Sequence, residues 1–331
     1  MALNRPTSHD IAKAAGVSQS TVSLVLRGDI RGRVSSATQA RVLEAANQLG
    51  YRPNEAARAL KSGQSRFIGL MVPDVADPYF VQVLRGAQSA AQSFGYSVVL
   101  LEGSISDDWV STAEGALSSR MVSGVVVCAP TFDKRVNRLF RLPVAFIDAG
   151  RLGTSMSVNL DVSDGMSQIA RHLVSLGHRR FGRLRAAVES TTFLERHQSF
   201  MNSLPEDGVV FEVFADEYSI DGAAKATDEL LRNRLAKVTA IVADSDLLAA
   251  GVYLGARARG LRIPFDLAVT GFDDIDLSRV LEPKLTTVRV SGQDAGTSAV
   301  KLLEKRFSNL PVETYSLPVD FVPRGSTLRA T

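Results

Sequence analysis

The chain has 331 residues, 45% of them apolar, which is enough to bury a large core and to form more than one domain. A single cysteine, Cys128, excludes an internal disulfide framework, and no apolar run is long enough for a membrane span or a secretory signal. Residues 1–66 contain 10 Lys and Arg against 4 Asp and Glu, whereas the other residues contain 28 against 31. We therefore expect a cytoplasmic protein with a basic N-terminal part and a mildly acidic body.

The sequence pattern of residues 7–26 predicts two short helices joined by a tight turn. Thr7 and Asp10 have the spacing of a capping box, which would begin the first helix. Gly16 supplies the backbone freedom for a sharp turn, and Ser18 can cap the second helix. The predicted inner side is apolar in both helices, at Ile11, Ala14 and Ala15 in the first and at Val22, Val25 and Leu26 in the second.

The outer face of the second predicted helix suits the major groove of DNA. It carries short, amide or cationic side chains beside one leucine, at Gln19, Ser20, Ser23, Leu24 and Arg27. Glutamine suits a bidentate contact with adenine, and leucine offers an apolar contact to a thymine methyl. This is the pattern of a helix-turn-helix, whereas the alternatives are an ordinary helical hairpin and a merely solvated basic face. The local excess of Lys and Arg favours DNA, and Arg31 and Arg33 would meet phosphates.

A third helix can start at Ser35, and its apolar stripe would be Val42, Ala45, Ala46 and Leu49. In the segment that follows, Asn54 can cap a helix of roughly seven residues, which Gly63 ends. A helix this short is marginal in water, so we expect it to become ordered only against a partner. Leu60 is a large apolar side chain in this cationic segment, with no obvious core to enter.

From residue 67 onward, short apolar runs alternate with helical patterns, which predicts parallel sheets covered by helices. The predicted strands are residues 67–72, 97–101, 124–128, 143–147, 181–185, 209–214, 239–243 and 267–271. Helical patterns lie between them, for example at 80–94, 164–175, 221–234 and 247–259. Parallel sheets bind ligands beyond the carboxyl ends of their strands. Polar residues follow several of these strands, at Asp74, Asp148, 244–246 and 273–274.

Motifs for catalysis, nucleotide binding or metal binding are missing from the sequence. It has no G-x-G-x-x-G, Walker A, G-x-S-x-G or H-E-x-x-H, and its four histidines have no metal-ligand spacing with cysteine. For His178, a structural hydrogen bond is favoured over catalysis. Asp273 and Asp274 are adjacent at a strand end and would point in different directions, so that one caps or holds a ligand hydroxyl. We expect no enzyme activity, no cofactor and no metal.

Seven short motifs follow one another along the chain. They are GVSQSTVS at 16–23, GYRPNEAARAL at 50–60, IGLMVPDVADPYF at 68–80, LGHRR at 176–180, GFDD at 271–274, LTTV at 285–288 and RGST at 324–327. Any one of them is weak, but seven in this order are highly specific. On these motifs the chain closely resembles the LacI/GalR family of bacterial transcription regulators along essentially its whole length.

The resemblance implies an N-terminal all-α helix-turn-helix headpiece and an α/β core of two Rossmann-like lobes, similar to a periplasmic binding protein. The headpiece would be residues 1–51, the hinge helix and linker 52–66, and the effector-binding and dimerisation core 67–331. Lobe 1 would comprise about 67–161 and 291–319, and lobe 2 about 162–290 and 320–331.

In such a regulator, paired hinge helices enter the minor groove at the centre of the site, and Leu60 would wedge between base pairs. The alternative is that Leu60 packs against its own core lobe. Two hinge helices must meet, so the protein would be a homodimer on a near-palindromic double-stranded operator. The candidate DNA contacts are Thr7, Ser18, Gln19, Ser20, Ser23, Leu24, Arg27, Arg33, Ser35, Thr38, Asn54, Ala57, Leu60 and Lys61.

The resemblance also implies an effector pocket between the lobes. Its candidate residues are Tyr79, Phe80, Asp148, Thr192, Arg196, Ser245, Asp246 and Asp273. An aromatic face with carboxylates and an arginine suits a carbohydrate. For Tyr79 and Phe80 the alternative is plain core packing, and for Arg196 it is a surface ion pair. The sequence departs from the family at Ala186, Ser199 and Ser245, so a nucleoside, a phosphorylated metabolite or no effector stays open.

These observations favour a sequence-specific DNA-binding regulator, most often a repressor in this family, whose operator affinity a small molecule controls. The alternative is a solute-binding module with weak or lost DNA specificity. It would bind a ligand but show little preference for any DNA sequence.

Overall fold

The computed structural model describes residues 6–27, 34–51, 65–101, 103, 108–131, 133–150, 152, 154–188, 190–233 and 237–327. The chain divides into two compact units, residues 1–65 and 66–331, which we call the headpiece and the core. In the described parts of the chain, no helix is long and apolar enough to cross a membrane.

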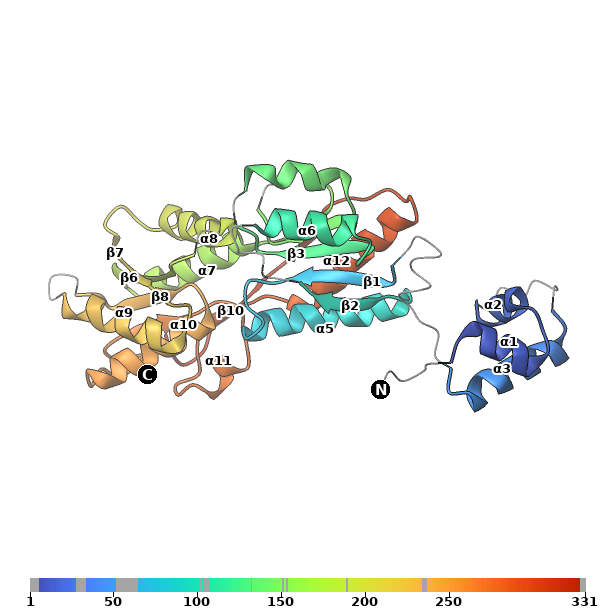
Figure 1. Ribbon diagram of the computed structural model, residues 1–331. Coiled ribbons are helices and arrows are strands. Elements are labelled where there is room, and N and C mark those ends of the chain that lie inside the picture. The colour runs from blue at the N-terminus through green and yellow to red at the C-terminus, as the bar shows by residue number, and fades with distance from the viewer. Residues whose placement is uncertain are drawn as a thin grey trace. The chain divides into compact units, whose positions relative to one another are not determined.

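The described headpiece contains three helices, α1 (Ser8–Ala15), α2 (Gln19–Arg27) and α3 (Ser36–Gln48) (Figure 1). The predicted capping box is present, because the Asp10 amide donates to Thr7 Oγ1 at 3.4 Å and Asp10 Oδ2 accepts the Thr7 amide at 2.7 Å. Gly16 ends α1 with φ +63°, a left-handed conformation that glycine adopts without strain. Ser18 Oγ accepts the Thr21 amide at 3.1 Å at the start of α2.

The three helices enclose a small core. Its buried members are Ile11, Ala12, Ala15, Val22, Val25, Val42, Ala45 and Ala46. Three residues of the predicted stripes are not among them, and one of these, Leu26, is partly buried against this core. Ala14 is exposed, and Ala12 is buried instead because α1 packs against both α2 and α3. Leu49 follows the last turn of α3 as its C-cap and is 40% exposed.

Lobe 1 of the core is built on a parallel six-stranded sheet in the order β11-β5-β4-β3-β1-β2 (Figure 1). The strands are β1 (Phe67–Met71), β2 (Ser97–Leu100), β3 (Gly124–Cys128), β4 (Val144–Ile147), β5 (Ser157–Leu160) and β11 (Tyr315–Leu317). One face, with Leu70 and Val126, packs on α5 (Pro78–Ser93) and α12 (Gly292–Phe307). The other face, with Met71 and Val127, packs on α6 (Trp109–Ser118) and the 3-10 helix η1 (Lys134–Arg141).

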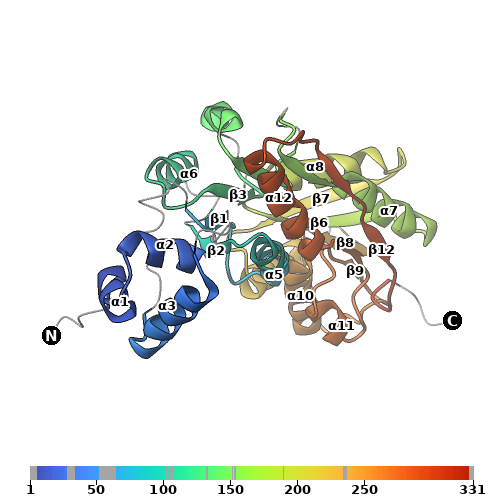
Figure 2. The same cartoon turned by 90° about the vertical axis from the view of Figure 1, so that its right-hand side faces the viewer.

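Helices α5 and α12 lie side by side (Figure 2). Glycine permits this close approach at two positions. A Cβ on Gly86 would lie 2.0 Å from the Gln293 carbonyl oxygen, and one on Gly296 would lie 2.1 Å from the Val83 carbonyl oxygen. Since both obstacles are backbone atoms, neither position has space for a larger residue.

Lobe 2 has a parallel four-stranded sheet in the order β7-β6-β8-β9. Its strands are β6 (Arg180–Ala186), β7 (Val209–Ala215), β8 (Ala240–Ala243) and β9 (Ala268–Thr270). Helices α7 (Val162–Ser175) and α8 (Thr191–Asn202) cover one face, and α9 (Ile220–Arg232) and α10 (Asp246–Ala258) cover the other. The short helix α11 (Leu277–Val280) and an antiparallel pair, β10 (Thr287–Arg289) with β12 (Asp320–Val322), complete the described elements.

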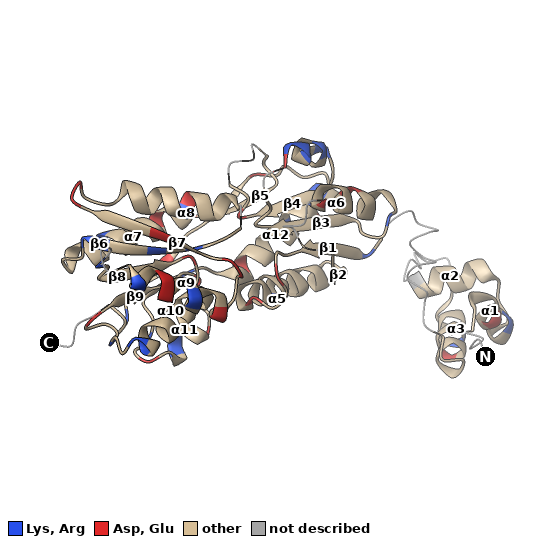
Figure 3. Ribbon diagram, turned by 60° about the vertical axis from the view of Figure 1, so that its left-hand side comes forward, with Lys and Arg blue, Asp and Glu red and all other residues tan. Residues whose placement is uncertain are grey.

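All eight predicted strands are present, and the four predicted helices correspond to α5, α7, α9 and α10. The chain passes between the two sheets three times: after β5, between β9 and α12, and between β11 and β12. The two sheets also differ in charge. Strands β1 to β5 contain no charged residue, whereas β6 carries Arg180, Arg183 and Arg185 (Figure 3).

Candidate functional site

The helix-turn-helix of the headpiece presents the N-terminal turn of α2 to solvent. Gln19 and Ser20 are exposed, whereas Ser23 and Leu24 one turn later are half-buried. The Gln19 Nε2 atom donates to Ser8 Oγ at 2.8 Å, so a side chain of α1 orients this amide. Ser8 was not predicted from the sequence. Both groups are free of the core and available to a base edge or a phosphate.

Other predicted DNA contacts have capping roles within the headpiece. Thr7 caps α1, and Ser18 Oγ lies 2.7 Å from Ser20 Oγ and 2.8 Å from the Thr21 hydroxyl. Ser35 caps α3 by accepting the Thr38 amide at 3.3 Å, and the hydroxyls of these two residues lie 2.9 Å apart. Arg27 is the last residue of α2. The remaining predicted DNA contacts lie outside the described residues, namely Arg31, Arg33, Asn54, Ala57, Leu60 and Lys61.

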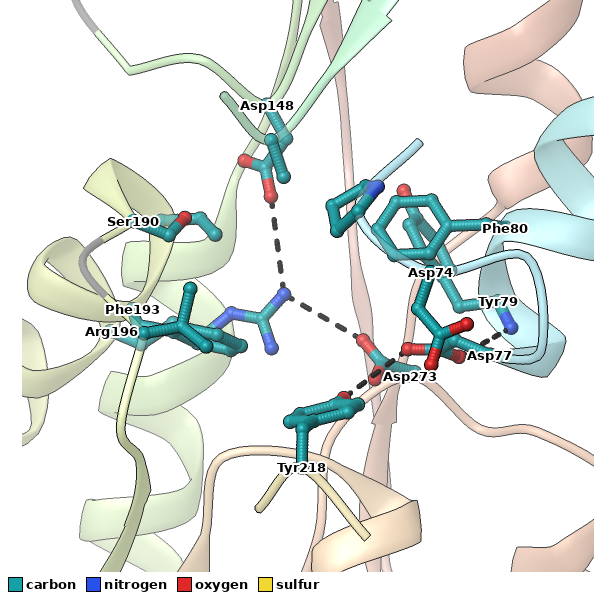
Figure 4. A pocket seen from close by; sticks show the side chains of 14 residues that line it. Asp74, Asp77, Tyr79, Phe80, Asp148, Ser190, Phe193, Arg196, Tyr218 and Asp273 are labelled. Carbon is teal, nitrogen blue, oxygen red and sulfur yellow. Dashed lines mark hydrogen bonds and ion pairs between the residues drawn. The ribbon is translucent and has the colours of Figure 1, made fainter. Parts of the chain in front are cut away.

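The core contains a cavity of about 220 Å³ between the carboxyl ends of strands in lobe 1 and lobe 2 (Figure 4). Its lining has four aromatic rings, four carboxyl groups and one guanidinium group. The lining residues are Pro73, Asp74, Asp77, Tyr79, Phe80, Ala129, Asp148, Val188, Ser190, Thr192, Phe193, Arg196, Tyr218 and Asp273. Six of the eight predicted effector residues are among them.

Arg196 on α8 extends into this cavity between two carboxylates (Figure 4). Its Nη2 atom lies 3.6 Å from Asp273 Oδ1 in lobe 2 and 4.0 Å from Asp148 Oδ2 in lobe 1. Its Nη1 atom donates to the Asp244 carbonyl oxygen at 2.9 Å, and its guanidinium lies 3.8 Å from the centre of the Phe272 ring. Arg196 is only 4% exposed. This burial agrees with the predicted position in a pocket and excludes the alternative of a surface ion pair.

Two further contacts join the lobes at the cavity. The Tyr218 hydroxyl, which follows β7 in lobe 2, donates to Asp77 Oδ2 in lobe 1 at 3.2 Å (Figure 4). Asp77 also caps α5, since its Oδ1 accepts the Tyr79 amide at 2.9 Å. Thr131 and Ser190 form an isolated antiparallel bridge between the lobes. The cavity is therefore closed by groups from both sides.

The rings of Tyr79 and Phe80 lie edge to face with their centres 5.1 Å apart. Both are buried in the apolar cluster around α5, and both also line the cavity. Tyr79 and Phe80 therefore belong to the core and also to the wall of the cavity. The packing of the rings against the core holds them in place at the edge of the pocket.

Two carboxylates of the pocket occur on left-handed backbone. Asp148 has φ +51° and directly follows β4, and Asp273 has φ +109° and lies three residues after the end of β9. Non-glycine residues at such angles are uncommon and concentrate at ligand sites, where the surrounding structure enforces them. The backbone thus turns these two side chains toward Arg196.

Burial dominates the electrostatics of the pocket. It raises the pKa of Asp148 and of Asp273 above the ordinary value, and the nearby charge of Arg196 opposes the rise. Burial also raises the pKa of Asp77, against the hydrogen bonds from the Tyr79 amide and Tyr218. For Arg196, burial acts to lower the pKa, but the charges of Asp273 and Asp148 outweigh it.

Ser245 and Asp246 do not line the cavity. Ser245 caps α10 by accepting the Leu248 amide at 3.3 Å. Asp246 accepts the Ile275 amide at 2.9 Å and the Thr287 hydroxyl at 2.5 Å, which fixes the segment after β9. The sequence placed them at the pocket because they follow β8, but the first turn of α10 directs both side chains into lobe 2.

The remaining predicted polar groups have structural roles. Asp274 points away from the pocket and pairs with Arg324 and Arg289 at 2.5 and 2.8 Å, so the two adjacent aspartates do diverge as expected. His178 Nδ1 lies 2.9 Å from the Thr239 hydroxyl, in agreement with the structural hydrogen bond favoured from the sequence. Among the described residues, no group of three His, Cys, Asp or Glu is placed to hold a metal ion.

Sequence reasoning did not include Asp77, Ser190, Phe193 and Tyr218 in the pocket. Ser190 and Phe193 flank the predicted Thr192, and Asp77 lies two residues before the predicted Tyr79. Tyr218 lies three residues beyond β7, so the rule that ligands bind beyond strand ends applies to it as well.

Comparisons with known proteins agree with this architecture. Residues 7–54 match the family described as bacterial regulatory proteins, lacI family, and residues 170–327 match a periplasmic binding protein-like domain. The ribose operon repressor of Halalkalibacterium halodurans is 32% identical over 97% of this chain and 97% of its own length.

Two solved structures align with nearly the whole chain. The lac repressor dimer bound to operator and the anti-inducer ONPF aligns with a TM-score of 0.86 at 27% identity, over 98% of this chain and 100% of that chain. A complex of the transcriptional regulator CelR with cellobiose aligns with a TM-score of 0.70 at 27% identity, over 97% of this chain and 100% of that chain. The predicted fold class is confirmed. Because these similarities extend through both the headpiece and the core, the chain belongs to the lacI family of bacterial regulatory proteins.

Proposed function

We propose that this protein represses transcription as a homodimer on a near-palindromic operator, and that a carbohydrate bound between the lobes controls its affinity for the operator. The observation that carries the proposal is the presence, in one chain, of an exposed recognition helix and a closed cavity between two lobes. The family consists of transcriptional regulators, and a regulator of bacterial genes acts in the cytoplasm. We assign the pocket to binding rather than to catalysis.

DNA recognition would use the N-terminal turn of α2. Gln19 and Ser20 are the exposed polar residues at that end, and the hydrogen bond to Ser8 holds the Gln19 amide in one orientation. An amide oriented before binding loses less conformational freedom when it contacts a base. The hinge segment around Leu60 would insert into the minor groove between the two half-sites.

Control by an effector would use the contacts that close the cavity. A ligand shifts the equilibrium between two lobe arrangements only as far as it binds one of them better than the other. In this pocket, Arg196 and Asp273 belong to lobe 2, whereas Asp148 and Asp77 belong to lobe 1. A ligand that contacts both sets therefore binds the closed arrangement better than the open one. The names of the ribose repressor and of the cellobiose complex support a carbohydrate.

The proposal is tested by selecting bound sites from a random pool of duplex DNA with the full-length dimer. We expect a near-palindromic motif, and we expect Gln19→Ala to weaken binding to that motif much more than binding to random duplex. Gln48→Ala is the matched control, because Gln48 is another exposed headpiece glutamine, on α3, and it contacts Glu44. No enriched motif, together with measurable sugar binding, would instead identify a solute-binding module.

A further inference from the structure

The pocket contains more acidic than basic side chains. Asp77, Asp148 and Asp273 are 6 to 7% exposed, and Arg196 is the one basic residue of the lining. The fourth lining carboxylate, Asp74, is exposed to solvent. The lone guanidinium already faces both Asp148 and Asp273, at 4.0 and 3.6 Å. Fully ionised, the three buried carboxylates exceed the guanidinium by two negative charges.

Nearby groups of the protein offset this excess only in part. Asp77 accepts the Tyr79 amide and the Tyr218 hydroxyl, and it lies at the N-terminus of α5, where a helix stabilises negative charge. Asp244, directly behind Arg196, has its own partner in the fully buried Arg183. Neither the contacts of Asp77 nor the Arg183–Asp244 pair adds a second cation beside Asp148 and Asp273, which share Arg196. A buried charge without a counter-charge is costly, so an excess carboxyl group either holds a proton in the empty pocket or is balanced by a ligand that carries positive charge.

Polar atoms of the lining also lack partners in the protein. The Tyr79 hydroxyl, the Ser190 hydroxyl and Arg196 Nε are buried and make no hydrogen bond. These residues are 6%, 8% and 4% exposed, and all three line the cavity. Arg196 Nε is a donor only, so it requires an acceptor oxygen on the ligand. The two hydroxyls can serve either as donors or as acceptors, as in contacts with the hydroxyl groups of a sugar.

The size and walls of the cavity indicate a single ring. A cavity of about 150 Å³ is sufficient for benzene, and this one measures about 220 Å³. The rings of Tyr79, Phe80, Phe193 and Tyr218 form part of its wall. Aromatic faces pack against the apolar face of a sugar and also attract a cation.

We propose that the ligand of this pocket is an amino sugar, a single hydroxylated ring whose protonated amine lies against Asp148, Asp273 or Asp77. The hydroxyl groups would engage Arg196 Nε and the hydroxyls of Tyr79 and Ser190. This inference rests on the proposed function, since it names the chemistry of the effector that controls the regulator. The inference excludes sugar phosphates and sugar acids, which would bring negative charge to a pocket that contains three buried carboxyl groups and one guanidinium.

The test is calorimetric titration of the full-length protein near neutral pH with sets of related sugars. Each set contains a free amine (glucosamine, galactosamine or mannosamine), its N-acetyl derivative, its parent hexose and its 6-phosphate. We expect one free amine to bind at least about 30-fold more tightly than its own N-acetyl derivative, parent hexose and 6-phosphate. A neutral or phosphorylated member that binds as tightly as its amine overturns the inference. Failure of every amine to bind also overturns it, as does binding of Mg²⁺ or K⁺ alone with the same stoichiometry.

Asp77→Asn is the variant that tests the charge, because asparagine can still cap α5. We expect this variant to weaken binding of the amine about tenfold or more beyond any loss in binding of the parent hexose, since the loss of a closing contact affects both sugars alike. Asp161→Asn is the matched control, since Asp161 caps α7 in the same way and does not line the cavity. Equal losses for amine and hexose in Asp77→Asn would show that Asp77 acts only through the fold.

The pH dependence gives an independent readout. A cation bound to ionised carboxylates binds more tightly as pH rises through the raised pKa of Asp148 and Asp273, up to the pKa of the amine. A neutral sugar that accepts hydrogen bonds from protonated carboxyls would bind less tightly over the same range. The ionisable groups that face this site are Asp74, Asp77, Tyr79, Asp148, Arg196, Tyr218 and Asp273, with Cys128, Glu195 and Asp244 beside them.

Titration of the same samples with the selected operator separates this inference from the proposed function. If operator affinity responds to a neutral or anionic sugar and to no amine, the amino-sugar inference fails, whereas the proposed function as an effector-controlled repressor stands. If no operator can be selected, the proposed function fails whatever the sugars do.

Discussion

The Tyr218 hydroxyl of lobe 2 donates a hydrogen bond to Asp77 Oδ2 of lobe 1 across 3.2 Å. The two residues lie 141 positions apart in the sequence, and their contact exists only while the lobes are close together. Asp77 also fixes the start of α5 through the Tyr79 amide. The same carboxylate therefore connects the cap of a lobe 1 helix to the closure of the cavity.

We expect Tyr218→Phe to shift the free protein toward the open arrangement. A hydrogen bond to a charged group contributes about 1.5–3 kcal/mol, so its loss would favour opening by about tenfold or more. Small-angle X-ray scattering should give a larger radius of gyration for the variant. Tyr253→Phe is the control, because Tyr253 donates to the Pro283 carbonyl at 2.6 Å within lobe 2. An equal radius for both variants would show that Tyr218 does not hold the lobes together.

Arg196→Ala and Asp273→Asn should abolish the response of operator binding to the effector and leave operator affinity itself close to that of wild type. Both residues face the cavity, and neither belongs to the headpiece. The measurement is operator affinity with and without the effector. Arg259→Ala is the control, because Arg259 forms its ion pair with Asp228 outside the cavity. Variants that still respond like wild type would place the effector site elsewhere.

For the hinge, which lies outside the described residues, we expect Leu60→Ala to lower specific operator affinity about 30-fold while the core stays folded and dimeric. The reason is that an apolar wedge between base pairs acts only on the bound duplex. Amide exchange across 54–61 should be fast in free protein and slow on the operator. Leu43→Ala is the control, since Leu43 on α3 is 54% exposed. Strong protection without DNA would contradict this account.

Asp246 should make the fold less stable in alkaline solution. Burial is the largest cause that raises its pKa, to about 8, while the hydrogen bonds from Thr287 and Ile275 oppose the rise. The folded state therefore holds a proton that the unfolded chain has released above its ordinary carboxyl pKa. The resulting stability is complete below about pH 4 and is lost as pH rises through about 8.

Thermal unfolding should be measured from pH 5 to pH 9, that is, from roughly one unit above the unfolded pKa of Asp246 to roughly one unit above its folded pKa. The Tm of wild type should fall over this range, and the Tm of Asp246→Asn should change less. Asp266→Asn supplies the comparison, because Arg262 lowers the pKa of Asp266 to about 2. Its stabilising effect is lost only in acid, so its removal should give a constant offset over this range. A wild-type slope retained in Asp246→Asn would assign the effect to another group.

The glycines between α5 and α12 give a prediction about stability. Gly296→Ala should lower the free energy of unfolding by about 1–3 kcal/mol, because the new Cβ would clash with the Val83 carbonyl oxygen. Gly115→Ala on α6 should raise it by about 0.5–1 kcal/mol, because no atom lies within 4 Å of that Cβ and alanine favours a helix. Denaturant unfolding of both variants measures the two effects, and the same sign for both would contradict the packing argument.

The positions of most buried strands could be predicted from sequence because they are largely apolar runs, such as Val125 to Cys128 in β3. Strands β5, β10, β11 and β12 were not predicted. They have three or four residues, and polar side chains interrupt them, as Asn159 does in β5. Their pairing depends on contacts distant in sequence, such as β5 with β11. Local patterns contain no information about such contacts.

The candidate pocket could be predicted where a residue follows a strand, as Asp148 and Asp273 do, or where the family resemblance implies it, as for Arg196 on α8. Tyr218 also follows a strand, three residues beyond β7, but no motif marks it, and its partner Asp77 is 141 positions away in the chain. Ser245 and Asp246 were placed on the wrong side because the sequence shows where α10 starts but not how its first turn is rotated. The headpiece helices were predicted because their caps are local, within three residues of each other.

The three crossings of the chain between the lobes constrain how the core can move. One connecting segment would let lobe 2 swivel in any direction, and two would still allow it to twist about the line that joins them. Three segments side by side resist both swivelling and twisting, so bending about a single axis is the easiest motion left. A ligand in the cavity would then convert a small local change into one reproducible displacement of lobe 1 against lobe 2, which is the kind of mechanical signal that a dimer can transmit to DNA.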